Sequence, residues 1–152
     1  MGSNRKKFFK FDWVIINQLA VGPAPKTQHD LNTLKEKKII SILSLCREDE
    51  APIPNNMQLE FKCERVILPD HKSGRIPTLN EINNALSVAK ELINNGPLYV
   101  HCFASMERSP LLCMAWLVKE HKLSPRQSLD YLMDVHKGTS PLSEQFLLLN
   151  QL

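Results

Sequence analysis

Apolar and polar residues alternate along the chain in short blocks, which predicts strands and helices in turn. Residues 13–21 are rich in β-formers and end at a Gly-Pro pair, as an opening strand or hairpin does. Residues 39–45 form a continuous apolar run bounded by polar sequence, which is typical of a strand buried on both faces. Two further strands are predicted at residues 59–68, where apolar and polar positions alternate, and at residues 98–101.

Capping residues mark where helices begin between these strands. Thr27 and Asp30 form a capping box, and Thr78 and Glu81 form another, each followed by apolar residues at helical spacing. The predicted helices run from Thr27 to near Lys38, from Leu79 to a stop at residues 95–97, over residues 109–121, and onward from the Ser-Pro pairs at 124–125 and 140–141. This order predicts an α/β domain with a central, mostly parallel sheet of about four to five strands flanked by helices.

Length and composition fit one domain over residues 1–152. Of the 152 residues, 43% are apolar and 23% are charged, both ordinary globular values, so wholesale disorder is excluded. The longest apolar runs are much shorter than the roughly 20 residues of a spanning helix, so we expect no integral membrane association. A net charge of +3 is too small to indicate a nucleic-acid partner.

The N-terminal segment and the cysteines indicate the compartment. Residues 1–10 contain the only basic run, Arg5-Lys6-Lys7, and are interpreted as a solvated arm with no secretory signal. The four cysteines form no C-x-x-C pair, which argues against a zinc site and against a disulfide scaffold. We therefore expect a reducing cytoplasm and interpret three of the cysteines as small buried hydrophobes, namely Cys46, Cys63 and Cys113. The sequence leaves open whether one of these three lies near enough to Cys102 to form a disulfide.

Cys102 does not fit that interpretation, because it stands between a predicted strand and an apolar helix. A loop that leaves a strand and enters a helix points backbone N–H groups at whatever it encloses, and the helix dipole adds partial positive charge. Such an environment lowers the pKa of a cysteine thiol. Arg108, six residues on, offers a planar two-pronged donor to two oxygens of one anion. Together these groups suit attack of sulfur on a phosphoryl group.

Cleavage of a phosphate monoester also needs a proton for the departing oxygen, and Asp70 is the candidate donor. It lies at the end of the predicted strand over residues 59–68 and opens a polar loop. If the sheet is parallel here, this strand end and the Cys102 loop emerge at the same edge, where α/β proteins bind ligands. Two neighbouring features are interpreted as solvated: His71, and the acidic run at residues 48–50.

These residues resemble the signature of the cysteine-dependent protein tyrosine phosphatases, in their small dual-specificity branch: His-Cys, five residues, Arg, then Ser or Thr. The resemblance covers most of the chain. It implies that Cys102 is the nucleophile, that Arg108 clamps the phosphate, and that Ser109 stabilises the thiolate as a leaving group. Asp70 is implied to be the general acid and base, and His101 to order the loop. The residues implied to surround the phosphate are Phe103, Ala104, Ser105, Met106, Glu107 and Arg108.

The resemblance also implies the reaction and its requirements. Phosphate monoesters on protein Tyr and Ser/Thr residues would be hydrolysed through a cysteinyl-phosphate intermediate, with neither metal nor cofactor. The expected partner is a phosphorylated protein or peptide, and the expected state is a monomer. Branches of the family that act on inositol phospholipids resemble one another in carrying lysines inside this loop. Here Glu107 is the only charged residue between Cys102 and Arg108, which favours a substrate with a single phosphate.

Ser105 departs from the family pattern, which has glycine at the middle of the loop. If this residue needs a positive φ, serine costs on the order of 1 kcal/mol there. The sequence alone therefore predicts that Ser105→Gly preserves or raises turnover.

Three alternatives stay open. The first is a pseudophosphatase that binds phosphorylated ligands without turnover. The second is a phosphatase of non-protein substrates, such as a glucan, an RNA 5′ end or a phosphoinositide. The third is a rhodanese-like sulfur transferase, which also places a cysteine on an anion-binding loop but requires neither Ser109 nor an upstream acid.

Overall fold

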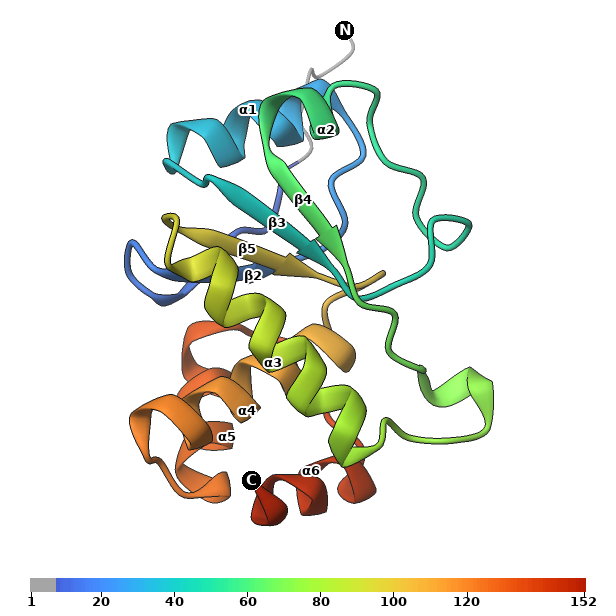
Figure 1. Ribbon diagram of the computed structural model, residues 1–152, viewed down its shortest axis with the longest axis vertical. Coiled ribbons are helices and arrows are strands. Elements are labelled where there is room, and N and C mark those ends of the chain that lie inside the picture. Colours follow the sequence, from blue (N-terminus) through green and yellow to red (C-terminus); the bar gives the residue numbers. More distant parts are fainter. Residues whose placement is uncertain (1–7) are drawn as a thin grey trace, which may run out of the picture.

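One five-stranded sheet runs through the molecule, in the order β1-β2-β5-β3-β4 (Figure 1). The computed structural model describes residues 8–152. The strands are β1 (Asp12–Ile15), β2 (Leu19–Gly22), β3 (Ser41–Ser44), β4 (Lys62–Arg65) and β5 (Leu98–His101). Among these described strands, the β1–β2 pair alone is antiparallel, since β2, β5, β3 and β4 pair in parallel. The expected mostly parallel α/β sheet is confirmed.

Helices cover both faces of this sheet. In chain order they are α1 (Gln28–Glu36), α2 (Met57–Glu60), α3 (Leu79–Ile93), α4 (Arg108–His121), α5 (Pro125–Val135) and α6 (Ser143–Leu148), with short 3₁₀ turns at η1 (His71–Ser73) and η2 (Leu149–Gln151). Helices α1 and α2 lie on one face, and α3 to α6 lie on the other (Figure 1). No described helix is both long enough and apolar enough to cross a membrane.

The three inner strands are buried along their whole length because helices pack on both of their faces. Leu43 and Val100 face the larger core with α3 and α4, whereas Ile42 and Tyr99 face the smaller core with α1. This alternation explains why residues 39–45 read as a continuous apolar run. The Tyr99 hydroxyl donates to the carbonyl of Pro23 at 2.6 Å, so the phenol is buried with its polar atom satisfied.

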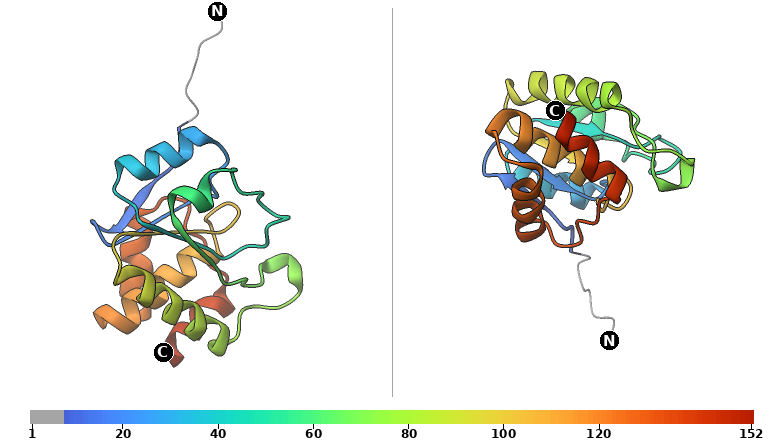
Figure 2. Two further views of the ribbon diagram at one scale, coloured as in Figure 1. Left: turned by 45° about the horizontal axis from the view of Figure 1, so that its top comes forward. Right: turned by 90° about the horizontal axis from the view of Figure 1, so that it is seen from below.

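The carboxyl ends of the parallel strands meet at one edge, and this register positions the site. Ser44 of β3 and Gly22 of β2 both lie beside His101, the last residue of β5. The chain leaves β5 directly into residues 102–108, which lead into α4. It also leaves β4 toward Asp70 and η1, a segment that stands out from the body of the domain (Figure 2).

Most predicted elements are present, and three predictions need correction. The predicted strand at residues 59–68 begins as α2 and continues as the shorter β4, because Met57 and Phe61 pack into the smaller core. The last helix begins at Ser143 instead of the Ser-Pro pair at 140–141, since the Ser140 N–H donates to the carbonyl of Met106. The part of the predicted arm at residues 1–7 lies outside the described residues. Phe9, however, is buried against Tyr99, so it does not belong to a solvated arm.

Candidate active site

The phosphate loop, residues 102–108, is held by contacts to its carbonyl groups. Backbone N–H groups of Ala24 and Ser140 donate to the carbonyls of Phe103 and Met106, at 3.5 and 2.8 Å. The carbonyl of Ser105 accepts from a histidine ring nitrogen at 2.7 Å. Because a trans peptide places its C=O and N–H on opposite sides, outward-facing carbonyls leave the following N–H groups facing inward. The loop thus forms a concave set of donors suited to an anion.

Cys102 lies at the floor of this loop. Its side chain is buried, with 3% of the residue exposed, but it lines the cavity enclosed by the loop. The sulfur lies 3.3 Å from the Ser109 hydroxyl. That hydroxyl is in the first turn of α4, so the helix N-terminus also faces the sulfur. All four cysteines are free thiols, and burial raises the pKa of both Cys46 and Cys113.

Arg108 is oriented by an acid that the sequence analysis interpreted as solvated. Its Nη2 and Nη1 donate to the two carboxylate oxygens of Glu50, at 2.8 and 3.2 Å, and Nη1 also donates to the carbonyl of Leu68 at 3.3 Å. The hydrogen bond from Arg108 lowers the pKa of Glu50, which keeps the pair charged. Among residues 8–152, Nε and the second N–H of Nη2 have no partner. These two donors lie on one edge of the guanidinium, which is the geometry that binds two oxygens of a phosphate.

His101 supports the loop from below as a neutral imidazole. Its Nδ1 lies 3.0 Å from the carbonyl of Cys102, and its Nε2 lies 2.7 Å from the Ser44 hydroxyl. A carbonyl only accepts, so Nδ1 carries the proton and Nε2 accepts from Ser44. Burial lowers the pKa of His101 to about 4, so the ring stays uncharged under ordinary conditions. His101 thereby fixes the peptide of the residue that carries the sulfur.

Ser105 adopts the positive φ that the family pattern implied, at 59°. Its side chain turns away from the cavity and into the protein. The hydroxyl lies 3.0 Å from Ser109 Oγ and 3.1 Å from His136 Nε2. His136 is buried and its Nδ1 lies 2.6 Å from a carboxylate oxygen of Asp12 in β1.

The acid loop, residues 70–77, closes one side of the cavity. Asp70 caps η1, where one carboxylate oxygen accepts from the Lys72 N–H at 3.1 Å. His71 Nδ1 lies 2.8 Å from Glu107 Oε2, and Gln145 Nε2 donates to Glu107 Oε1 at 2.6 Å. Glu107 therefore ties the acid loop to the phosphate loop and to α6. His71 is exposed, as the interpretation of a solvated histidine requires, but its ring also has a carboxylate partner, which that interpretation did not include.

The cavity between the two loops has a volume of about 680 Å³, much more than one phosphate occupies. Exposed apolar side chains of Phe103, Met106 and Leu142 form part of its rim. The charged residues lining it are Arg47, Glu50, Asp70, His71, Lys72, Glu107 and Arg108. Within residues 8–152, no group of three His, Cys, Asp or Glu side chains is arranged to hold a metal ion.

The structure brings together most residues predicted for the site. Cys102, Arg108 and Asp70 share one cavity with Phe103, Ala104, Met106 and Glu107, and Ser109 contacts the sulfur. Ser105, predicted beside the phosphate, does not line the cavity.

Five residues with roles at the site escaped the sequence analysis: Glu50, Gln145, His136, Asp12 and Ser44. Their contacts join segments far apart in the chain. The only signal in the sequence was negative charge at residues 48–50, which is equally typical of an exposed loop.

Known proteins resemble this chain in sequence and in fold. It is 29% identical over 117 residues to the tyrosine-protein phosphatase yvh1 of Schizosaccharomyces pombe, which covers 76% of this chain and 34% of that protein. It is 22% identical over 146 residues to phosphatidylglycerophosphatase and protein-tyrosine phosphatase 1 of Rattus norvegicus, covering 92% and 76%. The chain therefore spans about a third of the fission-yeast relative and three quarters of the rat relative.

A solved structure of PTPMT1 in complex with PI(5)P has the same fold, with a TM-score of 0.79 at 16% identity, covering 93% of this chain and 92% of that chain. The family model described as "Dual specificity phosphatase, catalytic domain" matches residues 21–152, which include both loops of the cavity. The chain therefore belongs to the dual specificity phosphatase catalytic domain family.

Proposed function

We propose that this chain is a phosphatase that hydrolyses phosphate monoesters on protein Tyr and Ser/Thr residues through a cysteinyl-phosphate intermediate. The supporting observation is that Cys102, Arg108 and Asp70 line one cavity, and that one edge of the Arg108 guanidinium has no partner among residues 8–152. These are the nucleophile, the phosphate clamp and the proton donor that such a reaction needs.

In the first step, the Cys102 thiolate attacks phosphorus while the P–O bond to the substrate breaks. Arg108 and the inward N–H groups of the phosphate loop stabilise the charge on the three other oxygens. Asp70, protonated, gives its proton to the departing oxygen. In the second step, Asp70 takes a proton from water as the water attacks phosphorus, and the S–P bond breaks with its electron pair returning to sulfur.

The charges around the cavity favour a substrate with a single phosphate. The three cations that line the cavity, Arg47, Lys72 and Arg108, are matched in number by three acids that line it too. Glu107, which the sequence analysis expected to repel a highly charged headgroup, is also paired with His71. A side chain carrying one phosphate matches this balance better than a headgroup with several.

A second candidate is a phospholipid monoester. The exposed rim residues Phe103 and Met106, at 53% and 52% exposure, offer apolar contact next to the phosphate position. The rat relative is named as a phosphatidylglycerophosphatase as well as a protein-tyrosine phosphatase. An aromatic phosphotyrosine ring and a lipid chain would both use such a rim, so substrates must be compared directly.

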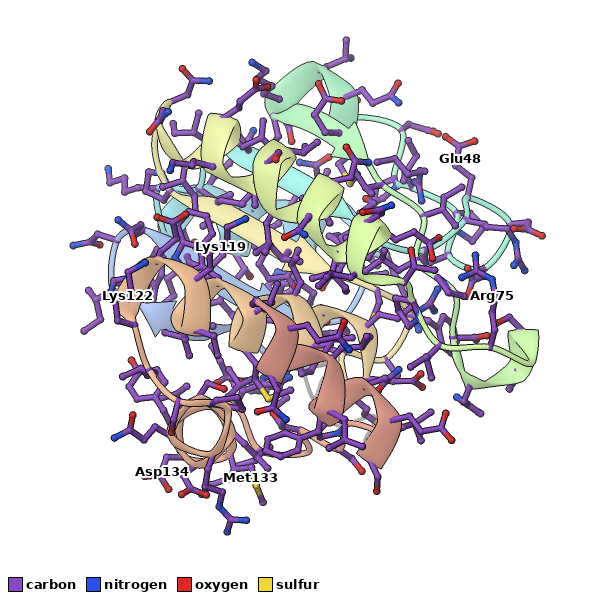
Figure 3. The ribbon with its side chains drawn as sticks, turned by 60° about the horizontal axis from the view of Figure 1, so that its bottom comes forward. Glu48, Arg75, Lys119, Lys122, Met133 and Asp134 are labelled. Atoms are coloured by element: carbon purple, nitrogen blue, oxygen red, sulfur yellow. The ribbon has the colours of Figure 1, made fainter. Side chains whose placement is uncertain are left out.

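The test compares wild type, Cys102→Ser and Asp70→Asn on an aryl phosphate, a phosphotyrosine peptide, a phosphoserine peptide and short-chain phosphatidylglycerophosphate. Cys102→Ser removes turnover, and Asp70→Asn lowers kcat by about 10²–10⁴-fold on substrates with poor leaving groups. The Asp70 effect is smallest on the activated aryl ester, which needs least help from an acid. Asp134→Asn, an exposed change on α5, is the matched control and leaves activity unchanged (Figure 3).

Three outcomes contradict the proposal. Faster turnover of the lipid than of both peptides selects the second candidate. Peptide binding without wild-type turnover identifies a pseudophosphatase, and sulfur transfer from thiosulfate without ester hydrolysis identifies a sulfur transferase.

A further inference from the structure

We propose that Asp12, His136 and Ser105 form a hydrogen-bond relay that points the Ser109 hydroxyl at the Cys102 sulfur. The three are positioning residues, since they act through Ser109 and do not themselves touch substrate. The inference rests on the proposed cysteinyl-phosphate chemistry. It concerns how this chain replaces the glycine that the family pattern has at the position of Ser105.

The relay is continuous and largely shielded from water. From β1 it runs through Asp12 Oδ2 to His136 Nδ1 at 2.6 Å, and from His136 Nε2 to Ser105 Oγ at 3.1 Å. It continues from Ser105 Oγ to Ser109 Oγ at 3.0 Å and from there to Cys102 Sγ at 3.3 Å. The two serines and His136 are each at most 2% exposed, and Asp12 is partly exposed at the outer end.

The chemistry of the partners sets the direction of every hydrogen bond. His136 Nε2 also lies 2.7 Å from the carbonyl of Ser105, which can only accept, so Nε2 carries a proton. That proton is shared between the Ser105 carbonyl and hydroxyl. A thiolate sulfur can only accept, so Ser109 donates to Cys102. With its one proton used there, Ser109 accepts from the Ser105 hydroxyl, which in turn accepts from His136. The relay thus ends at an acceptor, which is the arrangement that stabilises a thiolate.

Asp12 strengthens the donor at the start of the relay. Its carboxylate accepts from Nδ1, which fixes the ring orientation. Hydrogen bonds in a chain polarise one another when they all point the same way. Lys10 lies nearby but donates to the carbonyl of Lys137 and not to the relay.

This arrangement matters most when sulfur leaves phosphorus. At that point the S–P bond breaks and its electron pair returns to Cys102, where a fixed donor lowers the barrier. No proton has to move along the relay, because Ser109 only donates a hydrogen bond. Without the Ser105 hydroxyl, the sulfur is the only remaining side-chain partner of Ser109 Oγ among residues 8–152, so the rotation of this hydroxyl is less fixed.

The test separates the two chemical steps by rapid-quench kinetics on an aryl phosphate. Ser105→Gly removes the hydroxyl while relieving the positive φ, so the fold is not penalised. The expected result is about a tenfold lower kcat with a burst of aryl alcohol, because the departure of sulfur in the second step is slowed more than its attack in the first step. Ser109→Ala gives the same behaviour, and the double variant is no slower than Ser109→Ala alone, since both changes remove one interaction.

Three further variants separate the orientation of Ser105 from the packing around it. His136→Gln keeps a side-chain N–H near Ser105 and retains more activity than His136→Ala. Thr139→Val is the matched control, because Thr139 bonds the backbone carbonyl of His136 at 2.8 Å without joining the relay. It lowers stability but produces no burst.

The relay is overturned if Ser105→Gly keeps the kcat of wild type. It is also overturned if the double variant loses kcat by the product of the factors lost in Ser105→Gly and Ser109→Ala. The alkylation rate of Cys102 by iodoacetamide at neutral pH provides a readout that does not depend on turnover. It falls severalfold in Ser105→Gly if the relay stabilises the thiolate. If wild type is inactive but Ser105→Gly is alkylated more slowly than wild type, the proposed function is refuted and the relay stands. If wild type is active but the two proteins are alkylated at the same rate, the relay alone is refuted.

Discussion

At the scale of single residues, the hydrogen-bond partners at a position decide which side chain suits it as much as the backbone conformation does. Ser105 illustrates this, since its positive φ favours glycine but its hydroxyl has two buried partners. The backbone cost was visible in the sequence because it depends on one residue and a loop pattern. The benefit was not, because it depends on His136, which lies 31 residues away. From these contacts we expect Ser105→Gly to lower turnover, whereas the sequence alone predicts that it preserves or raises turnover.

Glu50 provides the prediction at this scale. In Glu50→Gln, an amide N–H group replaces one carboxylate oxygen and faces an Arg108 N–H, so the guanidinium loses its fixed orientation. We expect kcat/KM for an aryl phosphate to fall by about tenfold, mainly through KM, because one misaligned bidentate contact weakens phosphate binding. Steady-state kinetics and inhibition by inorganic phosphate both measure the change.

Glu48→Gln is the control for Glu50, since it removes the same charge from an exposed position in the same loop (Figure 3). An equal effect of both variants would mean that the loop contributes only general electrostatics. Because binding to Arg108 lowers the pKa of Glu50, the stabilisation from this pair is present at neutral pH. It is lost as the pH falls through the lowered value, so wild type loses more stability in acid than Glu50→Gln.

At the scale of elements, local signals predicted where helices begin, and long-range contacts decided the rest. The capping boxes at Thr27 and Thr78 are both present, as is the Ser124 cap, because a cap is defined within four residues. The Ser-Pro pair at 140–141 failed as a cap because Ser140 binds the phosphate loop instead. A mostly parallel sheet was expected from the alternation of strands and helices, and the parallel pairing of β3 with β4 and β5 meets the condition under which Asp70 and Cys102 share one edge.

The acid loop provides the prediction at this scale. His71→Ala removes the hydrogen bond between His71 Nδ1 and Glu107 Oε2, which ties this loop to the phosphate loop. We expect kcat to fall by at most about fivefold, since His71 is half-exposed and such pairs contribute about 0–1 kcal/mol. The loss is larger for phosphoserine than for an activated aryl phosphate, because only the former depends strongly on a well-placed Asp70.

Arg75→Gln is the matched change at the other end of the acid loop. Arg75, labelled in Figure 3, donates to both carboxylate oxygens of Glu81 at the start of α3, at 2.6 and 3.0 Å. We expect Arg75→Gln to lower thermal stability and to change kcat by the same factor for phosphoserine and for the aryl phosphate. If His71→Ala showed the same pattern as Arg75→Gln, the tie to Glu107 would have no part in positioning Asp70.

At the scale of the whole molecule, two cores are joined through a sheet whose central strand carries the site. β5 pairs with β2 and β3, so its last residue, His101, lies where both cores and the phosphate loop meet. A loop that must hold several N–H groups toward one point needs such a rigid base. The same burial that makes the base rigid also makes it sensitive to protonation of that histidine.

The acid sensitivity of the fold follows from His101. In the unfolded chain its pKa is about 6.5, whereas burial lowers the pKa to about 4 in the folded protein. Protons therefore bind the unfolded chain first, so the stabilisation from a neutral His101 is complete above about pH 6.5 and is lost as the pH falls toward 4. Between about pH 7 and pH 5, this effect lowers the free energy of unfolding by about 2 kcal/mol.

Urea unfolding of wild type and His101→Asn at the two pH values measures this effect. Asparagine keeps an N–H donor for the Cys102 carbonyl but does not titrate, so the variant is less stable overall and loses about 2 kcal/mol less between about pH 7 and pH 5. His121→Asn, which changes an exposed histidine at the end of α4, keeps the wild-type pH dependence. If His101→Asn kept that dependence too, the acid sensitivity would have to arise from the other ionisable groups and not from the histidine beneath the phosphate loop.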